Sequence, residues 1–352
     1  MNLHRILTCL LALICAPLSA QESIKALEIT GLRQPHNLAF DADGNVYGVE
    51  SLRTNRIFKL QGGKIEYISG VLWDSAPKGQ QPPEPSKPLD LAPAVYNSPT
   101  DIAVAPDGSI YVSDSSQHRV VRLDPKTYVA TGFAGAGQAG FSGDGGRADK
   151  AKFNIPTGVA LDPTGKFLIV ADLGNHRVRR IDLATQVVTT IAGNGKQGLP
   201  KDGTDALAAP LGYVRSACMA KDGTIYALLI ANDALVAVKD GKVTVVVNKA
   251  GQTGPAADGP AAEARMNKPK HVTMDAKDRV LILDTENHCL RLFDPVQKTV
   301  RTLAGNGKAG ATLGSDWAGT QLNRPHGARI GADGRLYVSD SENNRILIGT
   351  AP

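Results

Sequence analysis

The chain has 352 residues, of which 42% are hydrophobic and 21% charged, proportions typical of a folded globular protein rather than a disordered one. Its formal charge is only +5 and it contains no run of basic residues, which argues against nucleic acid as a partner. Aromatic residues make up 5% while 37 residues are glycine, so we expect many short strands joined by glycine turns.

The first 20 residues are predicted to be a signal peptide. Arg5 precedes an apolar run from Ile6 to Ala16, and the segment ends at Ala20, the small residue that signal peptidase requires. The run is too short for a membrane anchor, which needs about 20 residues. We therefore expect an exported protein, periplasmic or secreted, with no membrane anchor, in which residues 21–352 form one monomeric domain.

The rest of the chain repeats one pattern, seen most clearly in Ser98–Arg122. Two short alternating runs flank Pro106-Asp107-Gly108, and Asp-Gly between such runs predicts a tight hairpin turn. A polar turn headed by Asp114 then leads into a third run. Four copies share a head proline, a turn residue and an acidic residue at equal spacing: Pro35, Gly44 and Glu50; Pro99, Gly108 and Asp114; Pro269, Asp278 and Asp284; Pro325, Gly334 and Asp340.

Two further copies depart from this frame. Ile155–Arg180 carries one extra residue before its acidic residue, Asp172, and Val214–Val238 has Val214 for the proline and Leu229 for the acid. We interpret the repeated acid as a structural group that bonds the turn to the Asn-x-Arg sequence of the next strand. The fourth copy is then expected to keep its strands and to lack this tie.

Each of the first five copies is followed by a fourth alternating run, and the sixth is not. These runs are Lys64–Ser69, Tyr128–Phe133, Val187–Ala192, Lys242–Val247 and Thr299–Ala304. If Ile24–Thr30 supplies the missing strand of the last copy, the two ends of the chain are tied together and no sheet edge is left open. The predicted fold is an all-β, six-bladed β-propeller of four-stranded antiparallel blades, with the ring closed by the N-terminal strand.

The copies resemble the NHL repeat, a family named for an Asn-His-Leu tripeptide. The local equivalents are Asn175-His176-Arg177, Asn287-His288-Cys289 and Asn343-Asn344-Arg345, together with the head proline and the Asp-Gly turn. The resemblance implies a β-propeller and says little about function, because one fold hosts many chemistries.

Cleavage of the signal peptide leaves two cysteines, Cys218 and Cys289, in different copies of the repeat. A disulfide between them is possible in an oxidising compartment, but such cysteines are more often buried single residues. Cleavage also lowers Lys plus Arg from 39 to 38 against 34 acids, which remains a weak positive charge.

Long glycine-rich connections join the fourth runs to the next copies. Three of them spell the dinucleotide-binding fingerprint, at Gly135–Gly140, Gly193–Gly198 and Gly305–Gly310. That motif needs a following helix within a parallel βαβ unit, so we reject a dinucleotide cofactor. The first connection, residues 71–97, is instead a proline-rich insert that we expect to be an extended lip. The two tryptophans, Trp73 and Trp317, lie in connections and either form a stacking platform for a ligand or pack within their own loops.

We expect the ligand-binding or catalytic residues to lie at the mouth of the central channel, where the first strand of each blade begins. The residue after each head position is the natural mouth residue, and in order these are His36, Thr100, Thr157, Arg215, Lys270 and His326. Histidines flanked by Arg215 and Lys270 make a polar, partly cationic mouth. The leading hypothesis is a module that binds a protein, a carbohydrate or a small anionic ligand through His36, Arg215, Lys270, His326, Trp73 and Trp317.

A metal-dependent enzyme is the alternative. The lyase domain of the peptide-amidating enzyme is similar in fold and binds zinc through three histidines at such positions, and this chain has two, His36 and His326. Lys270 stands at the third, while His271 is one residue further on and is expected to point away from the channel. A calcium-dependent hydrolase similar to gluconolactonase would instead draw oxygen ligands from Asn37, Glu50 and Asp101. Zinc and calcium are therefore the cofactors to test for.

Overall fold

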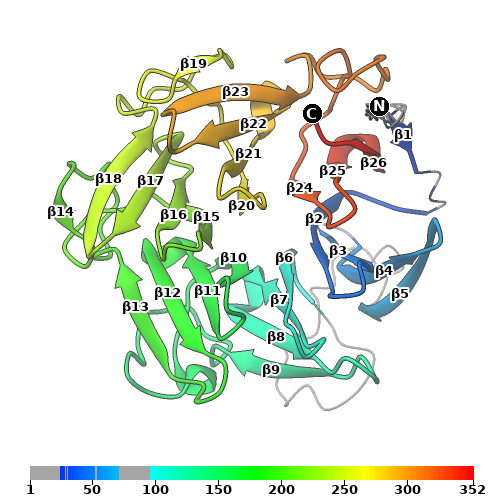
Figure 1. Cartoon of the computed structure of the whole chain (residues 1–352). Helices are drawn as coiled ribbons and strands as arrows, with labels where there is room; N and C mark the ends of the chain where they lie inside the picture. Colours follow the sequence, from blue (N-terminus) through cyan, green and yellow to red (C-terminus); the bar gives the residue numbers. More distant parts are fainter. Residues whose placement is uncertain (1–23, 28, 30, 52–53, 71–95) are drawn as a thin grey trace, which may run out of the picture.

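The computed structural model describes residues 24–27, 29, 31–51, 54–70 and 96–352. The predicted signal peptide, Trp73 and nearly all of the proline-rich insert lie outside the described residues. Within them, the chain forms six antiparallel sheets arranged around a central axis (Figure 1). The prediction of an all-β, six-bladed propeller is confirmed.

Each blade runs outward from the axis in chain order, so its first strand is innermost. Blades 1 and 2 consist of β2 (Pro35–Phe40), β3 (Val46–Glu50), β4 (Arg56–Gln61) and β5 (Lys64–Gly70), then β6 (Pro99–Val104), β7 (Ile110–Asp114), β8 (Arg119–Leu123) and β9 (Ala130–Ala134). Blades 3 and 4 consist of β10 (Pro156–Leu161), β11 (Phe167–Asp172), β12 (Arg177–Asp182) and β13 (Val188–Ala192), then β15 (Val214–Met219), β16 (Ile225–Leu229), β17 (Ala234–Lys239) and β18 (Lys242–Val247). Blades 5 and 6 consist of β20 (His271–Met274), β21 (Val280–Asp284), β22 (Cys289–Asp294) and β23 (Thr299–Ala304), then β24 (Gly327–Ile330), β25 (Arg335–Asp340) and β26 (Arg345–Thr350).

The sixth blade is completed from the other end of the chain. Its outermost strand is β1 (Lys25–Ala26), which pairs antiparallel with β26 through Lys25 opposite Ile348 and Ala26 opposite Leu347. The predicted closure by the N-terminal strand is therefore confirmed, although the paired segment is shorter than the predicted Ile24–Thr30.

Two blades carry a short additional strand that the sequence pattern did not predict. β14 (Thr204–Asp205) pairs with β18, and β19 (Gly259–Pro260) pairs with β23. Both lie in the connection that precedes their blade, which passes along the outer edge before entering the centre. Blades 4 and 5 are thus five-stranded, and the other four have four strands.

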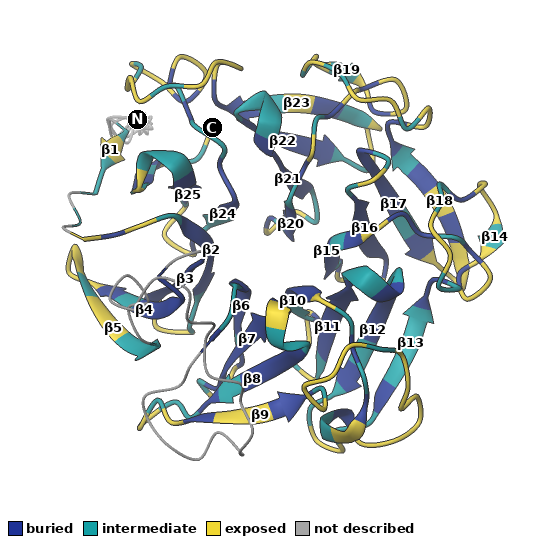
Figure 2. Cartoon of the chain, turned by 180° about the vertical axis from the view of Figure 1, so that it is seen from behind, coloured by how far each residue is buried: buried dark blue, intermediate teal, exposed yellow. Residues whose placement is uncertain are grey.

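The core lies between the faces of neighbouring blades. The second strands β3, β7, β16 and β21 are buried along their whole length, because both of their faces pack against other blades. Exposed residues gather on outer strands and connections (Figure 2). The two cysteines, Cys218 and Cys289, are free and buried, as expected of single core residues.

The repeated acid is a structural group, as predicted. In blade 2, Asp114 accepts hydrogen bonds from the Asn97 backbone N–H (2.7 Å) and from Arg119 Nε (2.9 Å). Glu50 and Asp340 pair likewise with the first arginine of the third strand, Arg56 and Arg345. Asp172 and Asp284 pair instead with an arginine two residues further along that strand, Arg179 (3.3 Å) and Arg291 (3.6 Å). Blade 4 has the fully buried Leu229 in this place and lacks the tie.

A different contact joins each pair of neighbouring blades. The residue before the third strand has a left-handed backbone, and its side chain accepts a hydrogen bond from the backbone N–H just before the head of the next blade. We call this contact the blade latch; its distances are 2.8 to 3.2 Å. The acceptors and donors are Asn55 and Ser98, His118 and Ile155, His176 and Tyr213, Asp233 and Lys268, His288 and Arg324, and Asn344 and Gln34.

The blade latch also explains the glycines of the apparent dinucleotide fingerprint. Gly135, Gly193 and Gly305 follow the fourth strands with φ of +93°, +98° and +90°, where other residues are strained. A Cβ at any of them would collide with the carbonyl oxygen of a latch histidine. These glycines therefore serve blade packing in antiparallel sheets.

Candidate functional site: the mouth of the central channel

The six residues that follow the head positions lie around the axis at one end of the channel. Thr100 Oγ1 donates to the Thr157 carbonyl (2.9 Å), and Thr157 Oγ1 donates to the Arg215 carbonyl (2.8 Å), so blades 2 to 4 are linked in sequence. On the other side, Lys270 contacts His326, and His326 contacts His36, linking blades 5, 6 and 1. The predicted residues His36, Arg215, Lys270 and His326 thus share one ring, which we call the mouth ring.

The two histidines of the mouth ring are stacked. Their ring centroids are 4.2 Å apart and their planes are inclined by 13°. His326 Nδ1 lies 2.8 Å from the Arg324 carbonyl oxygen, which can only accept, so Nδ1 carries the proton. His326 Nε2 then holds the lone pair and accepts from Lys270 Nζ at 3.1 Å. The neutral tautomer of His326 is therefore fixed by its two neighbours.

His36 has no such neighbours. It is 4% exposed, and neither of its ring nitrogens has a hydrogen-bond partner among the described residues. Burial lowers the pKa of His36 to about 3, with the charges of Arg215 and Lys270 acting in the same direction. Burial also lowers the pKa of His326 well below 6.5. Both imidazoles are therefore neutral near pH 7, and His36 offers two buried polar atoms to a bound group.

The mouth ring holds two side-chain cations, Arg215 and Lys270, on neighbouring blades. Within the described part of the chain, neither has a carboxylate at salt-bridge distance. Burial lowers the pKa of Arg215 to about 10, opposed by the charge of Asp101. The pKa of Lys270 is lowered to about 8, chiefly by burial and then by repulsion from the charges of Arg215 and Arg324. The charges of Glu286 and Glu342 act in the opposite direction and raise this pKa. The mouth ring is therefore a cationic surface in which positive charge lacks a direct partner.

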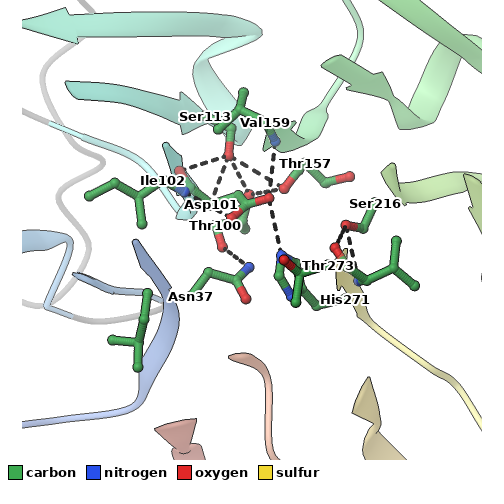
Figure 3. Close-up of polar contacts among 12 residues, drawn as sticks. Asn37, Thr100, Asp101, Ile102, Ser113, Thr157, Val159, Ser216, His271 and Thr273 are labelled. Atoms are coloured by element: carbon green, nitrogen blue, oxygen red, sulfur yellow. Dashed lines mark hydrogen bonds and ion pairs between the residues drawn. The ribbon is translucent and has the colours of Figure 1, made fainter. Parts of the chain in front are cut away.

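Below the mouth ring, one contact spans the channel. Asp101 Oδ2 of blade 2 lies 3.6 Å from His271 Nε2 of blade 5, and these blades are opposite one another in the ring (Figure 3). Both side chains are almost completely buried. Asn37 and Ser216 lie at the same level, and Asn37 donates to the Thr100 carbonyl at 2.9 Å. The Asp101–His271 contact therefore bridges the channel under the mouth ring, and we call Asn37, Asp101, Ser216 and His271 the polar floor.

The prediction that His271 points away from the channel is wrong. It assumed strict alternation from the first residue of the innermost strand. In blade 2 the ladder shifts register between Pro99 and Asp101, and in blade 5 strand pairing begins only at His271. Successive residues at these strand starts can therefore both face the axis, because alternation holds only within a regular ladder.

The polar floor is held chiefly by backbone amides. Asp101 accepts from the backbone N–H groups of Ile102 (2.9 Å) and Val159 (3.0 Å) as well as facing His271. Burial lowers the pKa of His271, although Asp101 opposes this shift. Two buried atoms, Asn37 Oδ1 and His271 Nδ1, have no partner among the described residues.

A cavity of about 340 Å³ lies at the end of the channel away from the mouth ring. Its lining includes Ala103, Cys218, Thr273 and Arg329. Arg329 donates through Nε to the Leu38 carbonyl (2.9 Å) and through Nη1 to Thr273 Oγ1. Sequence reasoning missed this cavity, although its residues stand two places after the floor residues, as Thr273 does after His271, and alternation could have indicated it.

The residues present do not fit the predicted zinc or calcium ion. Among the described residues, no three His, Cys, Asp or Glu side chains are grouped so that they could hold a metal. Both nitrogens of His326 are already engaged, and His36 is stacked parallel to it rather than converging with it on a common point. The calcium candidate Glu50 is bound in the structural tie to Arg56, at 2.7 Å.

Trp317 does not belong to the mouth. It is 3% exposed in the core beside Leu303 and Leu322, and its Nε1 donates to the Thr350 carbonyl at 2.8 Å. The prediction of a ligand-stacking role is therefore wrong for Trp317, which anchors the C-terminal strand of the sixth blade. The other tryptophan, Trp73, lies outside the described residues.

The fold and the site define a β-propeller with a cationic channel mouth, and comparison with known proteins agrees on the repeat. The NHL repeat model matches residues 96–123, 153–181 and 322–348. NHL repeat-containing protein 2 of Bos taurus is 27% identical over 287 residues, which are 72% of this chain and 39% of that protein. The chain is therefore a six-bladed β-propeller in which three segments match the NHL repeat.

Two further similarities are partial. The mouse (Mus musculus) peptidyl-glycine alpha-amidating monooxygenase is 31% identical over 147 residues, which are 41% of this chain and 13% of that protein. A solved auxiliary nutrient binding protein from Bacteroides thetaiotaomicron has a TM-score of 0.64 at 16% identity, covering 90% of this chain and 69% of its own. The chain spans about two fifths or less of both curated relatives, and the solved structure shares the fold.

Proposed function

We propose that this propeller binds a small anionic ligand, such as a carboxylate, in its channel mouth. The observation that carries the proposal is the pairing of Arg215 and Lys270, two half-buried cations with no carboxylate at salt-bridge distance among the described residues. Partly buried charge without a counter-charge is costly, and an anion entering the mouth would remove that cost.

The surroundings support an anion of small size. The Asp101–His271 contact bridges the channel below the mouth ring and would limit how far a ligand enters. Neutral His36 offers two unpartnered nitrogens that can hydrogen-bond to a ligand without adding charge. A guanidinium such as Arg215 matches the planar geometry of a carboxylate.

The proposal extends to the setting in which the propeller works. The predicted signal peptide favours export to the periplasm or beyond, where a monomeric binding protein could collect small solutes. The structural neighbour named as an auxiliary nutrient binding protein has the same fold. No helix among the described residues is long and apolar enough to cross a membrane.

A metal-dependent hydrolase or lyase is the weaker candidate. It is suggested by the partial match to the amidating enzyme, but the donor atoms of His36 and His326 do not converge. We therefore assign no catalytic role to a metal ion at this site.

Isothermal titration calorimetry with acetate and with inorganic phosphate tests the proposal. Wild-type protein should bind at least one of them, and Arg215→Gln should weaken binding by about tenfold or more, since a charge-assisted hydrogen bond contributes about 1.5–3 kcal/mol. Arg301→Gln, at an exposed arginine of β23, is the matched control and should bind like wild type. Equal affinity of wild type and Arg215→Gln, or no binding of either anion, would contradict the proposal.

A further inference from the structure

Lys270 has surroundings that set it apart from an ordinary surface lysine. Its Nζ lies 3.1 Å from the lone-pair nitrogen of His326, and it is partly buried in the mouth ring beside Arg215. Within the described residues, Glu286 and Glu342 pair with Arg324 rather than with Lys270. Those two carboxylates therefore leave the Lys270 ammonium without a direct counter-charge.

These surroundings favour the free amine. Removing water from an ammonium group and placing another cation nearby both destabilise the charged form. The pKa of Lys270 is lowered to about 8, so the side chain is mostly charged at pH 7 but about a tenth of it is free amine, far more than for an ordinary lysine. An uncharged amine in a ligand site is a nucleophile toward carbonyl carbon.

His326 is placed to move the proton that such a reaction releases. Its Nδ1–H donates to the Arg324 carbonyl, so the free lone pair on Nε2 faces Lys270 Nζ. If Nε2 takes a proton, the bond from Nδ1 to the carbonyl oxygen stabilises the cation that forms.

We propose that Lys270 forms a reversible imine with small anionic carbonyl compounds, namely 2-oxo acids and aldehydes that carry an acidic group. This inference rests on the proposed function, because Arg215 would hold the acidic group while Lys270 meets the carbonyl. Lys270 is then a catalytic residue of the site, and His326 is a positioning residue that transfers a proton.

The step balances without an oxidant or a reductant. The Nζ lone pair attacks the carbonyl carbon to form a C–N bond while the C=O π electrons move to oxygen, and Nζ gives one proton to His326 Nε2, which passes it to that oxygen to form a hydroxyl group. Nζ then gives its second proton to His326 Nε2, which passes it to the hydroxyl group as the C–O bond breaks. Water leaves, and a C=N bond remains between Lys270 and the ligand.

Reductive trapping tests the inference on the whole protein. We would treat wild type with glyoxylate and sodium cyanoborohydride at pH 7.5 and locate carboxymethylated lysines by peptide mass spectrometry. Lys270 should be modified about tenfold faster than Lys268, an exposed lysine two residues earlier, because a lower pKa supplies more free amine. Lys270→Arg should abolish the fast modification, and Lys268→Arg should not change it.

Two further arms separate the parts of the inference. His326→Gln should slow trapping of Lys270 several-fold, and an unchanged trapping rate would overturn the proton-transfer role. Propionaldehyde, which has no acidic group, should trap Lys270 more slowly than glyoxylate, and an equal rate would overturn the preference for anions.

The outcomes also distinguish this inference from the proposed function. If acetate binds and Arg215→Gln weakens it, but glyoxylate modifies lysines without preference, the imine is overturned and the anion site stands. If neither acetate binding nor selective trapping is found, both are overturned. Acetate binding and the preference for Lys270 in trapping are both measured on wild-type protein, so misfolding of a variant affects neither of these two measurements.

Discussion

The blade latches and the mouth ring occupy the same end of the repeats but differ in how their residues vary. Every latch makes the same hydrogen bond with a His, Asn or Asp acceptor, so all six blade boundaries are joined by one kind of contact. The mouth ring has His, Thr, Thr, Arg, Lys and His at equivalent positions. The repeated latch residues hold neighbouring blades together, and the unlike residues of the mouth ring determine which groups can bind in the channel mouth.

The comparison separates histidines that look alike in the sequence. His118, His176 and His288 are latch residues that accept a backbone hydrogen bond at the blade boundary. His36, His271 and His326 instead face the axis, and both nitrogens of His36 and Nδ1 of His271 have no hydrogen-bond partner among the described residues. Histidine at a repeated position is therefore structural here, and histidine at a unique position marks the site.

The largest effect is expected from breaking the structural tie between acid and arginine. Asp172→Ala leaves the fully buried Arg179 without its buried partner, and loss of one member of a buried pair costs about 3–5 kcal/mol. Urea unfolding should show this loss. Asp240→Asn, at an exposed turn, is the control and should change stability by less than about 0.5 kcal/mol. A loss below about 1 kcal/mol for Asp172→Ala would show that the tie is dispensable, as it is in blade 4.

The next effect concerns how stability depends on pH at the mouth. The pKa of His36 is about 3 in the folded state and 6.5 without burial. Between these values the unfolded chain binds a proton and the folded chain does not, so falling pH favours unfolding. This residue should therefore remove about 1.4 kcal/mol of stability per pH unit below pH 6.5.

His36→Gln should lack this contribution. The difference in unfolding free energy between wild type and His36→Gln, followed by urea titration from pH 7 to pH 4.5, should shift steadily in favour of the variant. A difference that stays constant with pH would mean that His36 is solvated and that the mouth ring is more open than described.

A smaller effect is expected at one blade latch. His176→Ala removes the acceptor of the Tyr213 backbone N–H and should cost about 1–2 kcal/mol. His176→Asn should recover most of this loss, because Asn344 fulfils the same role at 2.8 Å between blades 6 and 1. Thermal unfolding of both variants provides the test, and equal destabilisation by Ala and Asn would contradict the equivalence of the latches.

The smallest effect should be a gain in stability. Ile155, a latch donor, has φ of +52°, a conformation that costs a β-branched residue about 1–2 kcal/mol. Asn tolerates this conformation, so Ile155→Asn should raise stability by up to about 1 kcal/mol. Part of the gain is offset because Ile155 is 39% exposed and buries some apolar surface. A clear loss on calorimetric melting would mean that this packing outweighs the backbone strain.

The fold could be predicted because the repeat is long and regular. A head proline, a hairpin turn and an acid such as Asp114 recur at fixed spacing, and each has a local physical cause. The short strands β14 and β19 could not be predicted, since two residues carry no alternation. The blade latch escaped notice because His118, Asp233 and Asn344 look unrelated until one sees that each tolerates a left-handed backbone.

The site could be predicted in part. The head positions identified His36, Arg215, Lys270 and His326, because the innermost strand of a propeller must begin at the channel. The polar floor could not be predicted, because the irregular strand starts bring Asp101 and His271 to the axis against simple alternation. Trp317 was misassigned because its position in a connection does not reveal that the connection folds into the core.

A crystal structure of the protein with bound acetate, from crystals grown at pH 7.5, would test the anion site most directly. We expect acetate in the mouth ring, with its oxygens within hydrogen-bond distance of Arg215 and Lys270, and His36 in contact with it. Acetate in the cavity beside Arg329, or a mouth ring filled with water alone at saturating acetate, would contradict the assignment of the mouth as the ligand site.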